Sequence, residues 1–557
     1  MQLSSAMLCA MLLSSLFPVS ARAAREQVAN PEASLNVYVR ARLAEADGSL
    51  AAAANAYREA VALDPDSIEV AHRSYRQAVL AGDKALALRS AHNLDVVGLL
   101  PRDGVVLLLI DALDRRKWQD AQRLIDRLEQ EQNLAFLAPF MRSWLSMKSG
   151  PYAPPIVAAG ETYAVFAVRY LEEQLLVQRL ALRDRAGARD AFVEAQARKV
   201  AFGTEERWAL AAQFDRLGDR DIAEALLREA GVDAAGMTRA LKRAKKHYRQ
   251  NQLTPHYGLA LLMHRLAQDI AGRTKGTAPM SIARMAGFAA PQSDDMRLGI
   301  ASAALAADYP EMAYAEAGKI ASSSPVWTQG QMVQLRALIA QGKTDEAVTR
   351  AIGLATHEAA GVMGQRLLGD VFVQSGDYTR AAAAYGKAYD FLGEQEDAAL
   401  LLQWGGALEQ SGQWTQAKPL LERVIILAPD SPVALNHLGY ALADRGEELP
   451  RAIAMLEKAN RLRPGQAALI DSLGWAYYRN NQYDKALPLL ENAVAMEPGN
   501  AELNEHMGDI LWATGRHFEA RYAWKAALVA LDDADGKGDA HVRIAAKISG
   551  GVISANP

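Results

Sequence analysis

The sequence predicts an all-α fold, an extended right-handed α-solenoid of roughly 11–12 helical pairs if each pair takes about 34 residues. Three observations predict it. Small residues recur every 34 to 35 positions near the C-terminal end of the chain. Apolar residues fall at the spacing of a helix face almost everywhere, as at Leu469, Leu473, Ala476 and Tyr477. No segment shows the sustained alternation of Val, Ile and Thr that indicates a β-strand.

The repeat is clearest between residues 434 and 528. Each unit has a small residue in its first helix, an alanine in its second helix and, in most units, a proline after the second helix. These residues are Gly439, Gly474 and Gly508, then Ala452, Ala486 and Ala520, and finally Pro429, Pro464 and Pro498. The small residues let two helices approach closely, and the proline stops the second helix. The pattern of helix, tight turn and helix resembles the tetratricopeptide repeat (TPR).

The register continues towards the N-terminus with decreasing clarity. Gly405 with Ala417 marks one unit and Gly369 with Ala381 marks another. We therefore expect a signal peptide at 1–23, divergent TPR-like repeats over 24–360, well-defined repeats over 361–531 and a C-terminal tail over 532–557. At 557 residues the chain exceeds what one globular core usually supports, about 250–300 residues. A solenoid escapes that limit because each repeat packs only on its neighbours.

The N-terminal segment predicts export. Residues 6–19 form an apolar stretch that is followed by Ala21-Arg22-Ala23, which supplies the small residues that a signal peptidase needs. Residues 1–5 carry no Lys or Arg, so the alternative is a short first helix of the solenoid. Cys9 is the only cysteine, and Met7 and Leu8 before it do not form a lipidation motif. We expect a periplasmic protein without a lipid anchor, and no transmembrane segment after the signal peptide.

Charge and motifs argue against several classes of function. The formal net charge is −4, so no global basic field attracts nucleic acid. No two of the ten histidines lie three or four residues apart, the spacing of a helical metal pair. His437, His506 and His517 are expected to be surface or half-buried residues. The Gly342-Lys343-Thr344 sequence lacks the earlier glycine of a phosphate-binding loop. We expect no enzyme, no cofactor and no metal site.

The concave side of such a solenoid is the expected binding surface. In this fold the second, fifth, ninth, twelfth and thirteenth positions of each first helix line it. Tyr and Trp beside carboxylates and an Arg are typical of protein-binding hot spots. The candidate protein-binding residues in the last three repeats are Asn436, Tyr440, Asp471, Trp475, Tyr478, Arg479, Asp509 and Trp512. The alternative is that Trp475 and Trp512 pack against the neighbouring second helix.

Three runs in this region resemble more than a general TPR. Residues 438–445 read LGYALADR, residues 471–478 read DSLGWAYY and residues 506–512 read HMGDILW. They are similar to a family of proteobacterial envelope TPR proteins. Its best-understood member is a lipoprotein adaptor that binds a periplasmic C-terminal processing protease. The family adaptor is anchored by a lipidated cysteine, whereas this sequence has no comparable motif.

The resemblance implies an adaptor function. In that family the TPR superhelix brings the protease together with peptidoglycan hydrolases, which are then degraded. The implied partners are therefore a C-terminal processing protease and peptidoglycan hydrolases. The alternative is a scaffold for envelope assembly, in polysaccharide export or outer-membrane biogenesis. A non-catalytic protein-binding scaffold follows from the residues themselves, because the repeats form a surface and no catalytic motif accompanies them.

Overall fold

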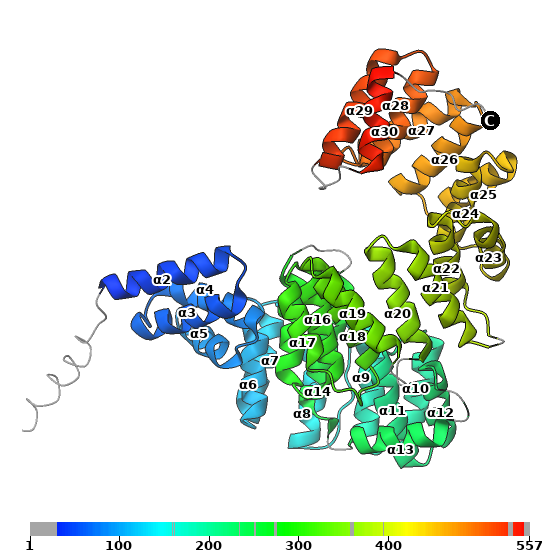
Figure 1. Ribbon diagram of the computed structural model, residues 1–557. Coiled ribbons are helices and arrows are strands. Elements are labelled where there is room, and N and C mark those ends of the chain that lie inside the picture. The colour runs from blue at the N-terminus through cyan, green and yellow to red at the C-terminus, as the bar shows by residue number, and fades with distance from the viewer. Residues whose placement is uncertain are drawn as a thin grey trace, which may run out of the picture. The chain divides into compact units, whose positions relative to one another are not determined.

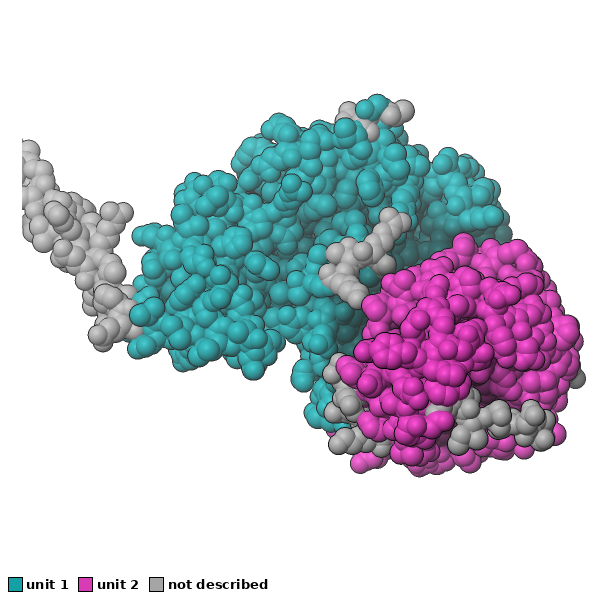
Figure 2. All heavy atoms as spheres, turned by 90° about the horizontal axis from the view of Figure 1, so that it is seen from above, with its two compact units in different colours: residues 1–343 teal, residues 344–557 magenta. Residues whose placement is uncertain are grey.

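The computed structural model confirms the all-α fold. It describes residues 31–158, 160, 162–232, 234, 236–249, 252–271, 276–356, 361–393, 395–532 and 538–550. These residues form 29 α-helices and one 3-10 turn, without a strand among them. The chain divides into two compact units, residues 1–343 and residues 344–557 (Figures 1 and 2). The predicted signal peptide at 1–23, with Cys9, lies outside the described residues.

Unit 1 is built of helices that pack mainly on their neighbours in the chain. Its elements are α2 (Pro31–Ala46), α3 (Leu50–Leu63), α4 (Ile68–Ala81), α5 (Lys84–Val96), α6 (Gly104–Asp114), α7 (Trp118–Gln130), η1 (Ala135–Leu137), α8 (Ala138–Ser149), α9 (Ala164–Ala181), α10 (Arg185–Ala197), α11 (Thr204–Leu217), α12 (Arg220–Glu229), α13 (Met237–His247), α14 (Pro255–Ala271), α15 (Ala278–Ala289), α16 (Asp294–Ala306), α17 (Pro310–Gly318) and α18 (Trp327–Ala340).

Unit 1 also contains contacts that a simple linear stack does not have. Helices α14 and α15 pack against α6, and α15 also packs against α4, although some two hundred residues separate α4 from α15. Arg284 of α15 is buried, and its Nε donates a hydrogen bond of 3.0 Å to the carbonyl oxygen of Leu80 in α4. Its Nη1 forms a 2.6 Å ion pair with Glu316 of α17. The repeats of unit 1 therefore close on one another.

Unit 2 follows the sequence repeat closely. Its helices are α19 (Thr344–Ala355), α20 (Gly361–Gln374), α21 (Tyr378–Asp390), α22 (Ala398–Gln410), α23 (Trp414–Leu427), α24 (Pro432–Arg445), α25 (Leu449–Leu462), α26 (Ala467–Arg479), α27 (Tyr483–Met496), α28 (Ala501–Ala513), α29 (His517–Asp532) and α30 (Asp539–Gly550). Pairs α20/α21 to α28/α29 each pack tightly, and the first helix α26 also contacts the first helices on either side of it, α24 and α28.

The small residues of the repeat lie where the sequence predicts a close approach. A Cβ atom added at Gly474 would overlap the side chain of Leu490 in the second helix of the pair, and one at Gly508 would overlap Trp524. From the other side, Ala486 and Ala520 are completely buried. The predicted role of these positions in helix packing is therefore confirmed.

Turns and caps fix the ends of the helices. Gly376, Gly412, Gly446 and Gly515 have positive φ angles of 70–81° in the turn between the two helices of their pairs, a conformation that glycine adopts without strain. The first helices α22, α24 and α28 begin at side-chain caps. For example, the Ser431 hydroxyl accepts a hydrogen bond from the Ala434 amide, and the Asn500 side chain accepts from Glu502 and Leu503.

The compact units meet between residues 343 and 344. The expected change from divergent to clear repeats near residue 360 stays a prediction. Residues 539–550, which fall in the expected C-terminal tail, form α30, and Ile544 of this helix is buried. Within the described part of the chain, no helix has both the length and the apolar character that crossing a membrane requires.

Candidate protein-binding groove

A cavity of about 710 Å³ lies in unit 2 and is lined mainly by residues of the first helices α24, α26 and α28 and of α30. We call it the α28 cavity. Its wall combines two aromatic rings with acidic and basic side chains. The lining residues are Tyr440, Asp444, Trp475, Asn500, Ala501, Glu502, Glu505, His506, Asp509, Leu531, Ala540, Arg543, Ile544 and Lys547.

Helix α28 supplies more polar groups to the cavity than any other helix. Glu502, Glu505, His506 and Asp509 are spaced i, i+3, i+4 and i+7, so they share one face of the helix. Gly508 and Leu511 lie on another face of α28 and pack against α29. The repeat therefore orients a charged stripe towards the cavity.

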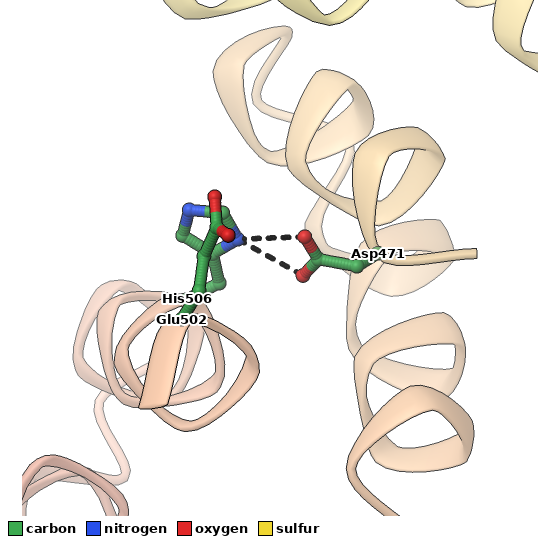
Figure 3. Close-up of side chains that lie close together, drawn as sticks. All are labelled: Asp471, Glu502 and His506. Carbon is green, nitrogen blue, oxygen red and sulfur yellow. Dashed lines mark hydrogen bonds and ion pairs between the residues drawn. The ribbon is translucent and has the colours of Figure 1, made fainter. Parts of the chain in front are cut away.

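Asp471 and His506 join neighbouring repeats (Figure 3). The Nδ1 of His506 lies 2.9 and 3.0 Å from the two carboxylate oxygens of Asp471, and both side chains are buried. Burial opposes the charged imidazolium, but the charge and hydrogen bond of Asp471 outweigh this effect, so the pKa of His506 is raised above its ordinary value. The expectation of a surface or half-buried His506 was wrong, because its partner comes from another repeat.

The carboxylate of Glu502 completes a group of three side chains. Glu502 is exposed and projects from the same helix as His506, one turn earlier (Figure 3). One ligand atom from each of Asp471, Glu502 and His506 lies within 4.8 Å of the others. The hydroxyl of Tyr440 on α24 donates a 3.2 Å hydrogen bond to Glu502. These three groups are of the types that bind transition metals.

Trp475 is the central aromatic residue of the site. Its ring stacks on the His506 imidazole with centroids 4.1 Å apart and an angle of 18°. Its Nε1 donates a 3.1 Å hydrogen bond to Asp444, and Tyr478 packs against it at 4.9 Å. Only 8% of Trp475 is exposed. The residue therefore contacts the first helices of the repeats on both sides, α24 through Asp444 and α28 through His506.

Helix α30 places two cations at the edge of the cavity. Arg543 forms a bidentate contact with Glu505 at 2.8 Å, and Lys547 lies 2.7 Å from Glu505 and 2.6 Å from Asp509. Burial opposes ionisation of Glu505, but the hydrogen bonds from Arg543 and Lys547 lower its pKa to about 2. Asp509 also accepts a 2.9 Å hydrogen bond from Nε1 of Trp524.

The eight predicted residues divide into two groups. Six lie in or beside the α28 cavity: Tyr440, Trp475 and Asp509 line it, Asp471 supports His506, and Tyr478 and Arg479 contact Trp475. Two do not line it. Trp512 stacks on His517 and lies 5.5 Å from Trp524 of α29, as the packing alternative expects for it. Asn436 is half-buried, and its Oδ1 has no hydrogen-bond partner. A partner-binding role for the eight residues stays a prediction.

Sequence reasoning missed Glu502, His506, Arg543 and Lys547 as members of the site. No histidine pair has the spacing of a helical metal site, but Glu502 and His506 lie four residues apart, which is the spacing that indicates one. Arg543 and Lys547 fall beyond the last marker of the repeat. They could have been found from the amphipathic spacing of Ile544 and Ile548 beside them.

Comparisons with known proteins agree with this architecture. Residues 333–397, 402–467 and 472–536 match the family model "Tetratricopeptide repeat". Residues 333–536 are therefore TPR sequence. A segment of 87 residues, 16% of this chain, is 38% identical to the TPR repeat-containing protein PA4667 of Pseudomonas aeruginosa. The match spans only 15% of the length of that relative.

Several solved structures match this chain at low TM-scores. The Cut9-Hcn1 structure, titled an APC/C hetero-tetramer, matches with 15% identity, coverage of 92% of this chain and 96% of that chain, and a TM-score of 0.41. MamA from Desulfovibrio magneticus RS-1 matches with 21% identity, coverage of 32% and 98%, and a TM-score of 0.27. YrrB, titled a TPR protein with an unusual peptide-binding site, matches with 21% identity, coverage of 31% and 88%, and a TM-score of 0.26.

Proposed function

We propose that the protein is a non-catalytic scaffold that binds a segment of a partner protein in the α28 cavity. The observation that carries the proposal is the wall of that cavity. It combines the half-buried ring of Tyr440 and the edge of Trp475 with the exposed carboxylates of Asp444 and Glu502. Aromatic groups beside charged groups are typical of binding hot spots, and TPR arrays present such surfaces to other proteins.

We further propose that the scaffold acts in the bacterial cell envelope as an adaptor. Support comes from the predicted signal peptide and from the three sequence runs that resemble the envelope adaptor family. In this proposal the protein presents peptidoglycan hydrolases to a periplasmic C-terminal processing protease. The local likeness to a TPR repeat-containing protein of a proteobacterium is consistent with the same family.

A pull-down from envelope extracts tests the adaptor proposal. The full chain should capture a processing protease as a leading partner, and a variant with Tyr440→Ala and Glu502→Lys should lose most of the captured protein. Asp390→Lys is the matched control, since Asp390 is exposed, lies at the end of α21 and does not line the cavity. Capture of envelope-assembly proteins without a protease would instead favour the assembly scaffold. Equal capture by both variants would contradict the proposed site.

The proposed compartment has its own test. Mass spectrometry of the protein from its native host should show an N-terminus at or close to Ala24 and no acyl group. An intact Met1 in the cytoplasmic fraction would remove the envelope proposal. It would leave the protein-binding proposal unaffected, because that rests on the cavity.

A further inference from the structure

We propose that Asp471, Glu502 and His506 form a binding site for a divalent transition-metal ion, Zn²⁺ in particular. The site joins two repeats, because Asp471 lies on α26 and the other two residues lie on α28 (Figure 3). It does not depend on the adaptor function, since it is inferred from side chains and their surroundings alone.

The distances suit a single ion. Ligand atoms held at about 2.0–2.2 Å from Zn²⁺ lie roughly 3–3.5 Å apart in a tetrahedral site. Here the His506 Nδ1 and the Asp471 oxygens are already 2.9–3.0 Å apart, and all three ligand atoms lie within 4.8 Å of one another. Glu502 is exposed, so its side chain can rotate to close the remaining gap while both helices stay in place.

The charges around the site favour a cation. Glu505 and Asp509 are neutralised by Arg543 and Lys547 of α30. Asp471 has His506 as its ion-pair partner and Glu502 has Tyr440 as its hydrogen-bond donor, and neither forms an ion pair with a Lys or Arg among the described residues. Two carboxylates beside one imidazole therefore carry negative charge that a divalent ion would offset.

The surroundings hold the ligands in position and leave one side open. The stacked ring of Trp475 fixes the plane of the His506 imidazole, which is only 6% exposed. The hydroxyl of Tyr440 orients Glu502, as outer-shell donors do at metal sites. Both Glu502 and His506 face the α28 cavity, so a fourth position is available to water or to a partner side chain. Imidazole selects Zn²⁺ over Mg²⁺ and Ca²⁺, which prefer oxygen ligands alone.

Calorimetric titration of the full chain after chelator treatment tests the site, with ZnCl₂ as the probe and MgCl₂ as the comparison. The wild type and Glu497→Gln should bind one Zn²⁺ ion with the same affinity. Glu502→Gln should weaken binding at least about tenfold, and Tyr440→Phe, which removes only the orienting hydroxyl, should also weaken it about tenfold. His506→Gln should remove the site.

Thermal melting of the same proteins separates loss of the site from loss of the fold. Glu502 is exposed, so Glu502→Gln should melt at the wild-type temperature without zinc and should lose the rise in melting temperature that zinc gives the wild type. Equal zinc affinity in the wild type, Glu502→Gln and Tyr440→Phe would overturn the proposal, because the ion would then be bound elsewhere. So would the absence of binding to the wild type.

Discussion

Trp475 connects two repeats, so its truncation should act on stability. The side chain is almost fully buried, stacks on His506 and donates to Asp444. Trp475→Ala should therefore cost about 3–5 kcal/mol of unfolding free energy, as for other buried aromatic residues. Denaturant unfolding measures this cost, and Tyr440→Phe, which keeps its ring, is a mild control. A wild-type melting curve with strongly weakened partner binding would instead show that Trp475 acts at the binding surface.

His264 should make unit 1 sensitive to acid. It is buried on α14, its Nε2 lies 2.8 Å from Nε2 of Gln268, and burial lowers its pKa to about 4. The folded state therefore disfavours the charged form. The contribution of neutral His264 to the free energy of unfolding is fully present above the ordinary pKa of about 6.5. It is lost as pH falls towards 4, with a slope of up to about 1.4 kcal/mol per pH unit.

The measurement is unfolding free energy between pH 7 and pH 4. His264→Gln should flatten the dependence in this window, whereas His517→Gln should not, because His517 is exposed. An unchanged slope in His264→Gln would mean that other groups cause the acid sensitivity.

Single residues differ in how well the sequence predicts them. Gly474 and Ala486 could be assigned because their roles arise within one helical pair, so spacing alone places them. The burial of His506 could not, because it depends on Asp471 in another repeat and on the tilt between repeats. The same dependence explains why Asp471, chosen as an exposed binding residue type, is buried.

At the scale of elements, Arg284 links α15 to α4 and α17. Arg284→Met should destabilise unit 1 by about 3–5 kcal/mol, because it leaves the buried carboxylate of Glu316 with only Lys319 as a partner. The double variant Arg284→Met/Glu316→Leu should recover much of that loss, since neither charge then remains buried. Urea unfolding of the single and double variants gives the coupling energy. Additive losses would contradict a direct interaction.

Contacts between helices that are distant in the sequence, such as those of Arg284, could not be predicted. Helices of unit 2 follow from local spacing, caps and turns. The contacts of α15 with α4 join positions some two hundred residues apart, and no periodicity in the sequence encodes which distant faces meet. Helix α30 was missed for a simpler reason: the markers of the repeat end before it.

At the scale of the whole chain, damage in one unit should stay local. Gly474→Leu would force a large side chain against Leu490, and overpacking of this kind typically costs about 1–3 kcal/mol. Hydrogen exchange should rise in α24–α28 and remain at wild-type values in unit 1, because repeats couple mainly to their neighbours. Gly499→Ala is the control, as a Cβ there meets no atom within 4 Å. Faster exchange throughout the chain would contradict this account.

The fold class was predictable for the whole chain, whereas its division into units was not. The same packing contact recurs in each repeat, because Gly405, Gly439 and Gly474 each lie against a leucine of the second helix of their pair. The boundary after Lys343 reflects where long-range contacts of unit 1 end, and such contacts leave no mark in composition or spacing.

Helix α30 has a consequence for assembly. It covers the last helical pair through Ile544 and Ile548, which pack on Leu511 and Trp524. A stack of repeats resembles a growing polymer, because every added pair recreates the surface that accepts the next one. Helix α30 acts as the chain terminator of that polymer. A protein ending at residue 532 would carry an uncapped growth end, open to head-to-tail addition of further molecules.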